Sequence, residues 1–121
     1  MYDLCFLRQV LLDVKKIEEI LKKESSLSLN EALCLCQHGN GFTDPSSLAR
    51  ELSLSPSRMT RILDSLTKKG YISRTESDGD RRSVTITMSQ KGLDCVKKLH
   101  SISLDLPQYL IDLAEQAQHN N

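Results

Sequence analysis

The sequence predicts a mainly α-helical, α+β fold in which several helices surround one small antiparallel hairpin. Three observations predict it. Apolar residues recur at helical spacing near both ends of the chain, two short helices in the middle are separated by a tight turn, and after Gly70 the apolar period changes to two. With 121 residues, of which 39% are hydrophobic and 26% charged, the chain has the size of one compact domain.

The first predicted helix covers residues 4–21. Its apolar residues recur at spacings of three and four, while its lysines and glutamates fall mostly on the other side, as in a helix that packs on a partner. A second helix is expected to start near residues 28–30 and to run through residues 32–36, which are apolar on nearly every side and therefore central. The cluster Gly39-Asn40-Gly41 ends this helix.

Two short helices follow this pair. Thr43 or Asp44 can cap the first of them, and Ser55 can cap the second, which begins at Pro56 and closes at Gly70. Only a tight connection lies between the two. Two short helices joined in this way form a helix-turn-helix.

The segment after Gly70 predicts a hairpin. Residues 71–75 and 84–88 read as two strands, the second with inward aliphatic residues that alternate with outward threonines, and a turn around Asp78-Gly79 joins them. Ser89 then caps a helix that runs through Leu99. Pro107 interrupts the chain, and one last short helix is expected before a polar tail.

Positive charge is concentrated in the middle of the chain. The 16 Lys and Arg balance the 16 Asp and Glu, so the net charge is zero. Residues 50–100, however, hold eleven basic and six acidic side chains, whereas residues 101–121 hold three acidic side chains and no Lys or Arg. The distribution of charge matters more than its sum for nucleic-acid binding. The middle of the chain therefore remains a candidate for nucleic-acid binding, and the two ends are expected to serve another purpose.

The outer face of helix 56–69 has the composition of a DNA-reading helix. Arginine suits bidentate contact with guanine, and small hydroxyl residues fit against phosphates or base edges in the major groove. The alternative interpretation is an ordinary solvated, charged face. Arg58 and Arg61, three residues apart, project to the same side of the helix. The candidate contacts on this helix and beside it are Ser55, Ser57, Arg58, Thr60, Arg61, Lys68 and Arg74.

The hairpin tip Asp78-Gly79-Asp80-Arg81-Arg82 is a more specific signal. An ordinary turn needs the Asp-Gly pair but has no use for two consecutive arginines. An arginine held out on a narrow hairpin can enter the minor groove, where the negative potential of DNA is strongest, and the neighbouring carboxylate of Asp80 could brace its guanidinium. Asp80, Arg81 and Arg82 therefore join the candidate DNA-binding residues.

These motifs resemble the MarR family of regulators. The resemblance covers residues 3–115 and is carried by the run RILDSLTKKGYISR from Arg61, by Asp80-Arg81-Arg82, and by the run ITMSQKG from Ile86. It implies a single MarR-like domain over residues 1–121. In that domain a winged helix-turn-helix core, residues 28–89, lies between terminal helices that pair two chains, in residues 1–24 and 90–121.

The resemblance also implies a function. It implies a transcriptional regulator, most simply a repressor, that binds a near-palindromic operator in double-stranded DNA as a homodimer. Arg82 is similar to the minor-groove arginine of the family and Asp80 to its brace, and Ser57, Arg58, Thr60 and Arg61 resemble the major-groove readers. A small phenolic or lipophilic effector, or thiol oxidation, often releases such regulators from DNA.

A second function remains open, because a winged helix can be reused as a protein-interaction module that binds no DNA. Outward acidic residues on the second helix of the helix-turn-helix would favour it. Asp64 is the only acidic residue between Pro56 and Gly70.

A third possibility is a thiol-based hydroperoxide sensor. The segment Leu4-Cys5-Phe6 resembles the one that bears the reactive cysteine in a hydroperoxide-sensing branch of the family, which makes Cys5 a candidate redox residue. A reactive thiol needs hydrogen-bond donors for its thiolate. The positions where that branch has tyrosines correspond here to Leu29 and Ala32, so a small apolar role for Cys5 at a helix interface is the competing interpretation.

Other chemistry is not expected. Cys34, Cys36 and His38 cannot converge on one metal ion from a single helix, because Cys36 points away from the other two. Neither a cofactor-binding motif nor a catalytic constellation can be assembled, so the protein is not expected to be an enzyme. The chain contains no apolar run of membrane-spanning length and no basic leader, and its cysteines have no paired spacing. We therefore expect a cytoplasmic protein with reduced thiols and no membrane partner.

Overall fold

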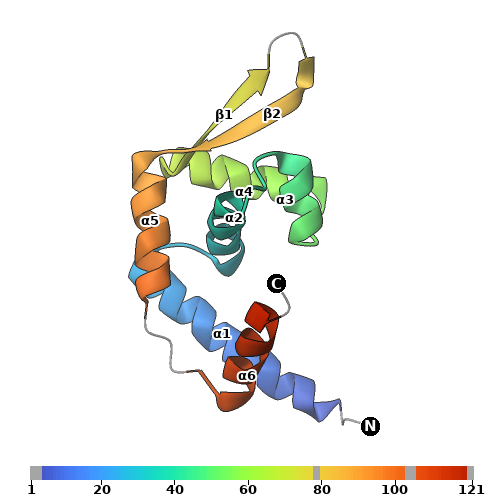
Figure 1. Cartoon of the computed structure of the whole chain (residues 1–121), viewed down its shortest axis with the longest axis vertical. Helices are drawn as coiled ribbons and strands as arrows, with labels where there is room; N and C mark the ends of the chain where they lie inside the picture. The colour runs from blue at the N-terminus through green and yellow to red at the C-terminus, as the bar shows by residue number, and fades with distance from the viewer. Residues whose placement is uncertain (1–3, 78–79, 103–105, 120–121) are drawn as a thin grey trace.

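The computed structural model describes residues 4–77, 80–102 and 106–119, which form six helices and one two-stranded antiparallel sheet (Figure 1). The mainly helical α+β prediction is confirmed. A central body contains α2, α3, α4 and the hairpin, α5 runs down one side, and α1 and α6 lie together at the end opposite the hairpin. The bounds are α1 Cys5–Ser25, α2 Leu29–Gly39, α3 Pro45–Glu51, α4 Pro56–Lys68, β1 Ile72–Ser77, β2 Asp80–Met88, α5 Gln90–Ser101 and α6 Gln108–His119.

The hydrophobic core belongs mostly to the central body. Leucines from α2, α3 and α4 are completely or almost completely buried, and Ile72 and Ile86 close the core from the sheet side. α1 contributes Leu21 near its end, with Ile17 packed beside it. The largest fully buried side chains are Leu27, Leu35, Leu48, Met59, Leu63 and Leu66.

Side-chain caps stabilise the first turns of α2, α3 and α4. Ser28 accepts a hydrogen bond from the backbone N–H of Glu31, and the Glu31 carboxylate accepts one from the backbone N–H of Ser28, which completes a capping box at the start of α2. Asp44, rather than Thr43, caps α3. Ser55 caps α4 as predicted. These caps satisfy N–H groups that have no partner within the helices.

Thr43 and His38 instead tie the body to the sheet. The Thr43 carbonyl oxygen accepts a hydrogen bond from the Ile86 backbone N–H at 2.8 Å. The His38 imidazole Nε2–H donates to the Ile86 carbonyl oxygen at 2.7 Å. Ile86 itself is buried, so both bonds hold β2 against the helices at the point where the strand enters the core.

α1 extends four residues beyond its predicted end at Leu21, to Ser25. Ser25 fits within the last helical turn because its hydroxyl donates back to the Leu21 carbonyl oxygen. Ser26 then ends the helix in the left-handed conformation, with a φ of 62°, and its N–H bonds to Lys22.

The two strands pair from Ile72 opposite Met88 to Glu76 opposite Val84, and the register changes between Glu76 and Ser77. Both strands are longer than predicted, because β1 continues to Ser77 and β2 begins at Asp80. The buried side of the predicted alternation is confirmed at Ile86, between the exposed Thr85 and Thr87.

α5 begins in close contact with the end of the preceding helix and strand. The Ser89 hydroxyl caps α5 at Gly92 and lies 2.6 Å from the Gly70 carbonyl oxygen. A Cβ atom at Gly92 would lie 2.3 Å from the Tyr71 carbonyl oxygen and 2.6 Å from Met88 Cγ. Only glycine allows this approach, which explains why residue 92, three positions after the capping Ser89, is a glycine.

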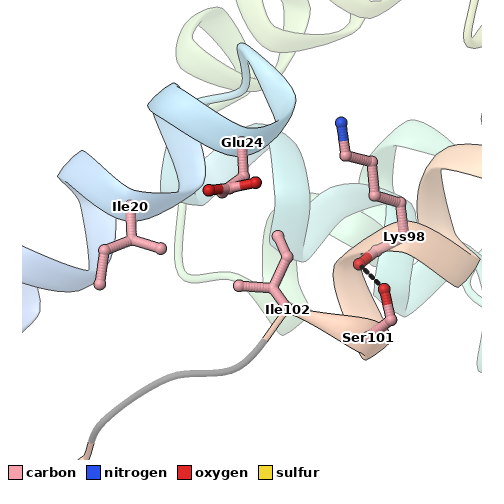
Figure 2. Close-up of a pocket in the computed structure, with 5 residues that line it drawn as sticks. All are labelled: Ile20, Glu24, Lys98, Ser101 and Ile102. Carbon is pink, nitrogen blue, oxygen red and sulfur yellow. Dashed lines mark hydrogen bonds between the residues drawn. The ribbon is translucent and has the colours of Figure 1, made fainter.

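The far end of α5 meets the end of α1 around a pocket of about 290 Å³ (Figure 2). Ile20 of α1 and Ile102 form its apolar wall, while Glu24 and Lys98 provide charged side chains on its two sides. Ser101 donates a hydrogen bond to the Lys98 carbonyl oxygen. The pocket therefore lies where the terminal helix joins the body.

α1 and α6 contact each other through one polar and one aromatic interaction. The Tyr109 hydroxyl donates a short hydrogen bond to the buried Asp13 carboxylate, which also accepts one from Gln9. This bond raises the pKa of Tyr109 to about 12. The rings of Phe6 and Tyr109 meet edge to face, with their centroids 6.0 Å apart. α6 is thus held along the first half of α1.

Candidate nucleic-acid interface

The exposed face of α4 is the centre of the candidate interface. Met59, Leu63 and Leu66 are buried, and this defines the inner side of the helix. At about 100° per residue, the line of side chains opposite them is Ser57, Arg61, Asp64 and Lys68. All the residues predicted to contact DNA from this helix are exposed, namely Ser57, Arg58, Thr60, Arg61 and Lys68.

The hydroxyl groups in the first turn of α4 are partly engaged with the helix itself. Ser55 accepts from the Arg58 backbone N–H at 3.3 Å, and its hydroxyl oxygen lies 3.3 Å from that of Ser57. Thr60 donates to the Pro56 carbonyl oxygen at 2.9 Å. These hydroxyl groups therefore stabilise the first turn of α4, while Arg58 and Arg61 provide the positive charge on its exposed face.

Arg58 and Arg61 form no ion pair with any residue that the structure describes. Arg74, the other arginine predicted beside this helix, is different. Its guanidinium lies 2.8 Å from the carboxylate of Asp64, so the first strand of the hairpin is tied to the middle of α4. Arg74 thereby neutralises the negative charge of Asp64 on the exposed side of α4.

The paired strands β1 and β2 extend beyond the body (Figure 1). The backbone of residues 80–82 belongs to β2. The side chains of Asp80, Arg81 and Arg82, and the expected bracing of Arg82 by Asp80, lie outside the described part of the structure. The predicted wing is thus placed by its backbone alone, and the ion pair between Asp64 and Arg74 joins the first strand of the hairpin to α4.

A buried carboxylate holds the end of α4 against α2. The Glu31 carboxylate lies 3.0 Å from the Lys69 ammonium and accepts a bond from the Ser65 hydroxyl at 2.8 Å. Lys69 also donates to the Ser26 carbonyl oxygen. Sequence reasoning missed this cluster. The available signal was the spacing of Ser28 and Glu31, which is that of a capping box.

The charge of Glu31 is well stabilised in this position. Burial by itself raises the pKa of its carboxyl, but the hydrogen bonds from the Ser28 backbone, Lys69 and Ser65, together with the positive charge of Lys69, bring the pKa below its ordinary value of 4.5. Glu31 is therefore ionised at neutral pH, and it links the start of α2 to the end of α4.

Lys91 of α5 also contacts the C-terminal end of α4. Its ammonium donates to the Lys69 carbonyl oxygen at 2.7 Å and lies 5.0 Å from the centroid of the Tyr71 ring. The last carbonyls of α4 thus have a cation next to them. This contact explains the lysine that precedes Gly92 in the sequence run noted above.

The cysteines lie in different environments. Burial raises the pKa of Cys34 to about 11, and the negative charge of Glu31 adds to the effect. Burial also raises the pKa values of the half-buried Cys36 and Cys95. Cys5 is exposed in the first turn of α1, at the end remote from α2, which carries Leu29 and Ala32 (Figure 1).

Within the described residues no group of three His, Cys, Asp or Glu side chains is placed to hold a metal ion. The helices of the same residues include none that is both long and apolar enough to cross a membrane.

Comparison with known proteins matches residues 27–84 to the MarR family model. The HTH-type transcriptional regulator YhbI of Bacillus subtilis is 34% identical over 85 residues, which are 69% of this chain and 55% of YhbI. The transcriptional repressor MprA of Escherichia coli is 32% identical over 90 residues, which are 70% of this chain and 51% of MprA. The chain thus spans about half the length of these relatives.

Solved structures show the same fold. A MarR variant from E. coli, in complex with operator DNA, superposes with a TM-score of 0.70 at 20% identity and 94% coverage of both chains. Streptococcus pneumoniae FabT in complex with DNA superposes with a TM-score of 0.68 at 25% identity, covering 95% of this chain and 89% of FabT. With the helix-turn-helix and hairpin described above, these matches show that the chain belongs to the MarR family of winged helix-turn-helix proteins.

Proposed function

We propose that the protein is a sequence-specific DNA-binding transcriptional regulator that acts as a homodimer and, most simply, as a repressor. The observation that carries the proposal is the exposed face of α4, where Arg58 and Arg61 are exposed and have no ionic partner among the described residues. A helix with free arginines on its outer face is suited to the major groove, where guanine offers two acceptors to one guanidinium.

The hairpin supports a second contact with DNA. Arg81 and Arg82 belong to β2, which pairs with β1 and extends with it beyond the body. When α4 lies in the major groove, a projecting hairpin can reach the adjacent minor groove, where an arginine is favoured by the negative potential. Arg82 is the arginine that we assign to this groove, with Asp80 as its brace and Arg81 beside it.

The terminal helices support the homodimer. Leu4, Leu7 and Leu11 follow one side of α1 and are 77%, 57% and 54% exposed, and Leu113 of α6 is 58% exposed. Apolar side chains gathered in this way mark an interaction surface. A second copy of the chain is the partner that we propose, because two-fold pairing of identical helices makes the patch its own complement. A two-fold dimer would present two α4 helices to a near-palindromic operator.

For the effector expected of such a regulator, we propose the pocket in Figure 2 as the binding site. Its isoleucine wall suits the apolar part of a small phenolic or lipophilic compound, and Glu24 and Lys98 offer charged groups beside that wall. Release of bound DNA by small phenolic compounds, lost in Lys98→Ala, would support this site. Release that is unchanged in Lys98→Ala would exclude it.

The function is tested by sequencing the genomic fragments that the protein selects from sheared DNA. We expect one enriched near-palindromic motif, with binding lost in Arg61→Ala and in Arg82→Ala. Lys97→Ala is the matched control, because it removes an exposed cation from α5, outside the proposed interface. Selection of no fragment, together with stable capture of a protein partner, would replace the proposal with a protein-interaction function. Unchanged affinity in both arginine variants would also refute it.

A further inference from the structure

An open pocket of about 300 Å³ lies between α4 and the start of α2. Ser28 and Asn30 line it from the side of α2, and Arg58, Arg61 and Ile62 line it from α4. Two arginines without ionic partners among the described residues therefore border one concave surface. Such a surface suits an anion.

The two arginines reach this pocket from different sides of α4. Positions three apart differ by about 60° around a helix. Arg61 lies on the outermost line, opposite the buried Leu63. Arg58 lies on the flank that also carries Ser65 and Lys69, and both of these bond to Glu31 of α2. The Cα atom of Arg58 is thus on the side of α4 that faces α2, whereas that of Arg61 lies on the line opposite the buried face, and both side chains border the pocket.

The Glu31 carboxylate, which meets this flank of α4, forms its ion pair with Lys69 and not with Arg58. Both oxygens of Glu31 already accept hydrogen bonds, from the Ser28 backbone, from Ser65 and from Lys69, whose ammonium compensates the charge. Asp64, the acidic residue of α4, is paired with Arg74. Arg58 consequently keeps its full charge available for a ligand, and the Asn30 side chain can add a neutral donor from across the pocket.

Position relative to the groove separates the two roles. A helix in the major groove is bordered on each side by a phosphate backbone, so its outermost side chains reach base edges while those on its flank reach phosphates. We propose that Arg58, with Asn30, binds a DNA backbone phosphate in the pocket between α2 and α4, and that Arg61 reads bases. The assignment rests on the proposed DNA-binding function. It gives the two arginines different roles: Arg58 fixes the position of the protein on the DNA backbone, and Arg61 recognises the base sequence.

The test measures the affinity of the dimer for its selected operator and for a scrambled duplex over a range of salt concentrations. Arg58→Ala is expected to weaken both complexes by the same factor and to reduce the slope of log K against log salt by about 0.9 for each of the two pockets in the dimer, about 1.8 in total. Arg61→Ala is expected to lower the operator-to-scrambled ratio by about 5- to 100-fold for each half-site. Arg58→Lys should restore the slope, because it retains the charge. Asn30→Ala should weaken both complexes modestly without changing the slope.

Several results would overturn the assignment. One is a fall in the operator-to-scrambled ratio in Arg58→Ala with an unchanged salt slope, which would make Arg58 a base reader. Another is Arg58→Ala binding both duplexes as the wild type does. Circular dichroism and thermal melting establish that each variant is folded. Failure of the wild-type protein to bind any duplex would instead refute the proposed function and this assignment with it.

Discussion

The central body and the pair of terminal helices differ in where their apolar side chains find cover. In the body, Leu27, Leu35 and Leu66 are completely buried within one chain. On the terminal helices, by contrast, Leu4 and Leu113 remain more than half exposed. The body therefore buries its apolar side chains within one chain, whereas those of α1 and α6 would be buried only by contact with another molecule.

Polar interactions show the same difference. The body is linked across elements by Glu31 with Lys69, by Asp64 with Arg74 and by His38 with Ile86. The described contacts between α1 and α6 are the hydrogen bond between Asp13 and Tyr109 and the aromatic pair next to it. We therefore expect substitutions in the body to change the stability of the chain, and those on the terminal face to change its assembly.

The largest effect is expected from the double substitution Leu7→Glu and Leu11→Glu. It places two charges on the exposed apolar side of α1, where they would be desolvated in a dimer. Because each subunit carries both changes, we expect the dimer to dissociate at least about 100-fold more readily. Sedimentation equilibrium measures this, while the circular dichroism of the body should be unchanged.

The matched control is Leu93→Glu. Leu93 is also an exposed leucine, at 48%, but it lies in the first turn of α5, near the hairpin and far from α1. It should leave the mass in solution unchanged. Equal dissociation in both variants, or in neither, would contradict the division between body and terminal face.

The next effect is expected in the body, from Gly92→Ala. The added methyl group would lie 2.3 Å from the Tyr71 carbonyl oxygen, which is backbone and cannot rotate away. α5 must then shift from the end of α4, and we expect a loss of about 3 kcal/mol in the free energy of unfolding. Urea unfolding of the monomeric double variant measures it without a contribution from assembly. Gly39→Ala is the control, because nothing lies within 4 Å of the atom it adds.

A smaller effect is expected from Glu31→Gln, about 1–2 kcal/mol at pH 7, because the bond to Lys69 loses its charge. The pH dependence has a definite sign. The pKa of Glu31 is lowered in the folded chain, so the carboxylate stabilises it above pH 4.5, and this contribution disappears as the pH falls through the folded-state pKa below 4.5. Unfolding at a series of pH values should bring wild type and variant together in acid. A difference that persists there would contradict this explanation.

Sequence reasoning located the helices and the hairpin well, because caps and periodicity are local properties of the chain. Ser55 and Ser89 cap helices as predicted. It missed the interactions between distant positions, such as the bonds from Glu31 to Ser65 and Lys69, because no local pattern shows which helix a buried carboxylate will meet.

The same limit applies to the candidate interface. The pattern placed Arg58 and Arg61 on one side of a helix, and both are exposed. Only the position of α2 shows that Arg58 borders a pocket with Asn30, and only the hairpin shows that Arg74 meets Asp64. Residue type therefore predicted the chemistry of the interface, whereas the division of roles within it depends on packing.

The smallest effect is expected at the ion pair between Arg74 and Asp64, which joins the hairpin to α4. Both side chains are partly exposed, so their coupling in a double-mutant cycle of Arg74→Ala and Asp64→Asn should be about 0.5 kcal/mol in the free energy of unfolding. DNA affinity is the sharper measurement. If Arg74 acts by neutralising Asp64, then Arg74→Ala should weaken DNA binding, and adding Asp64→Asn should restore most of the loss. A loss that Asp64→Asn does not restore would make Arg74 a direct DNA contact, as its place among the predicted DNA-binding residues implies.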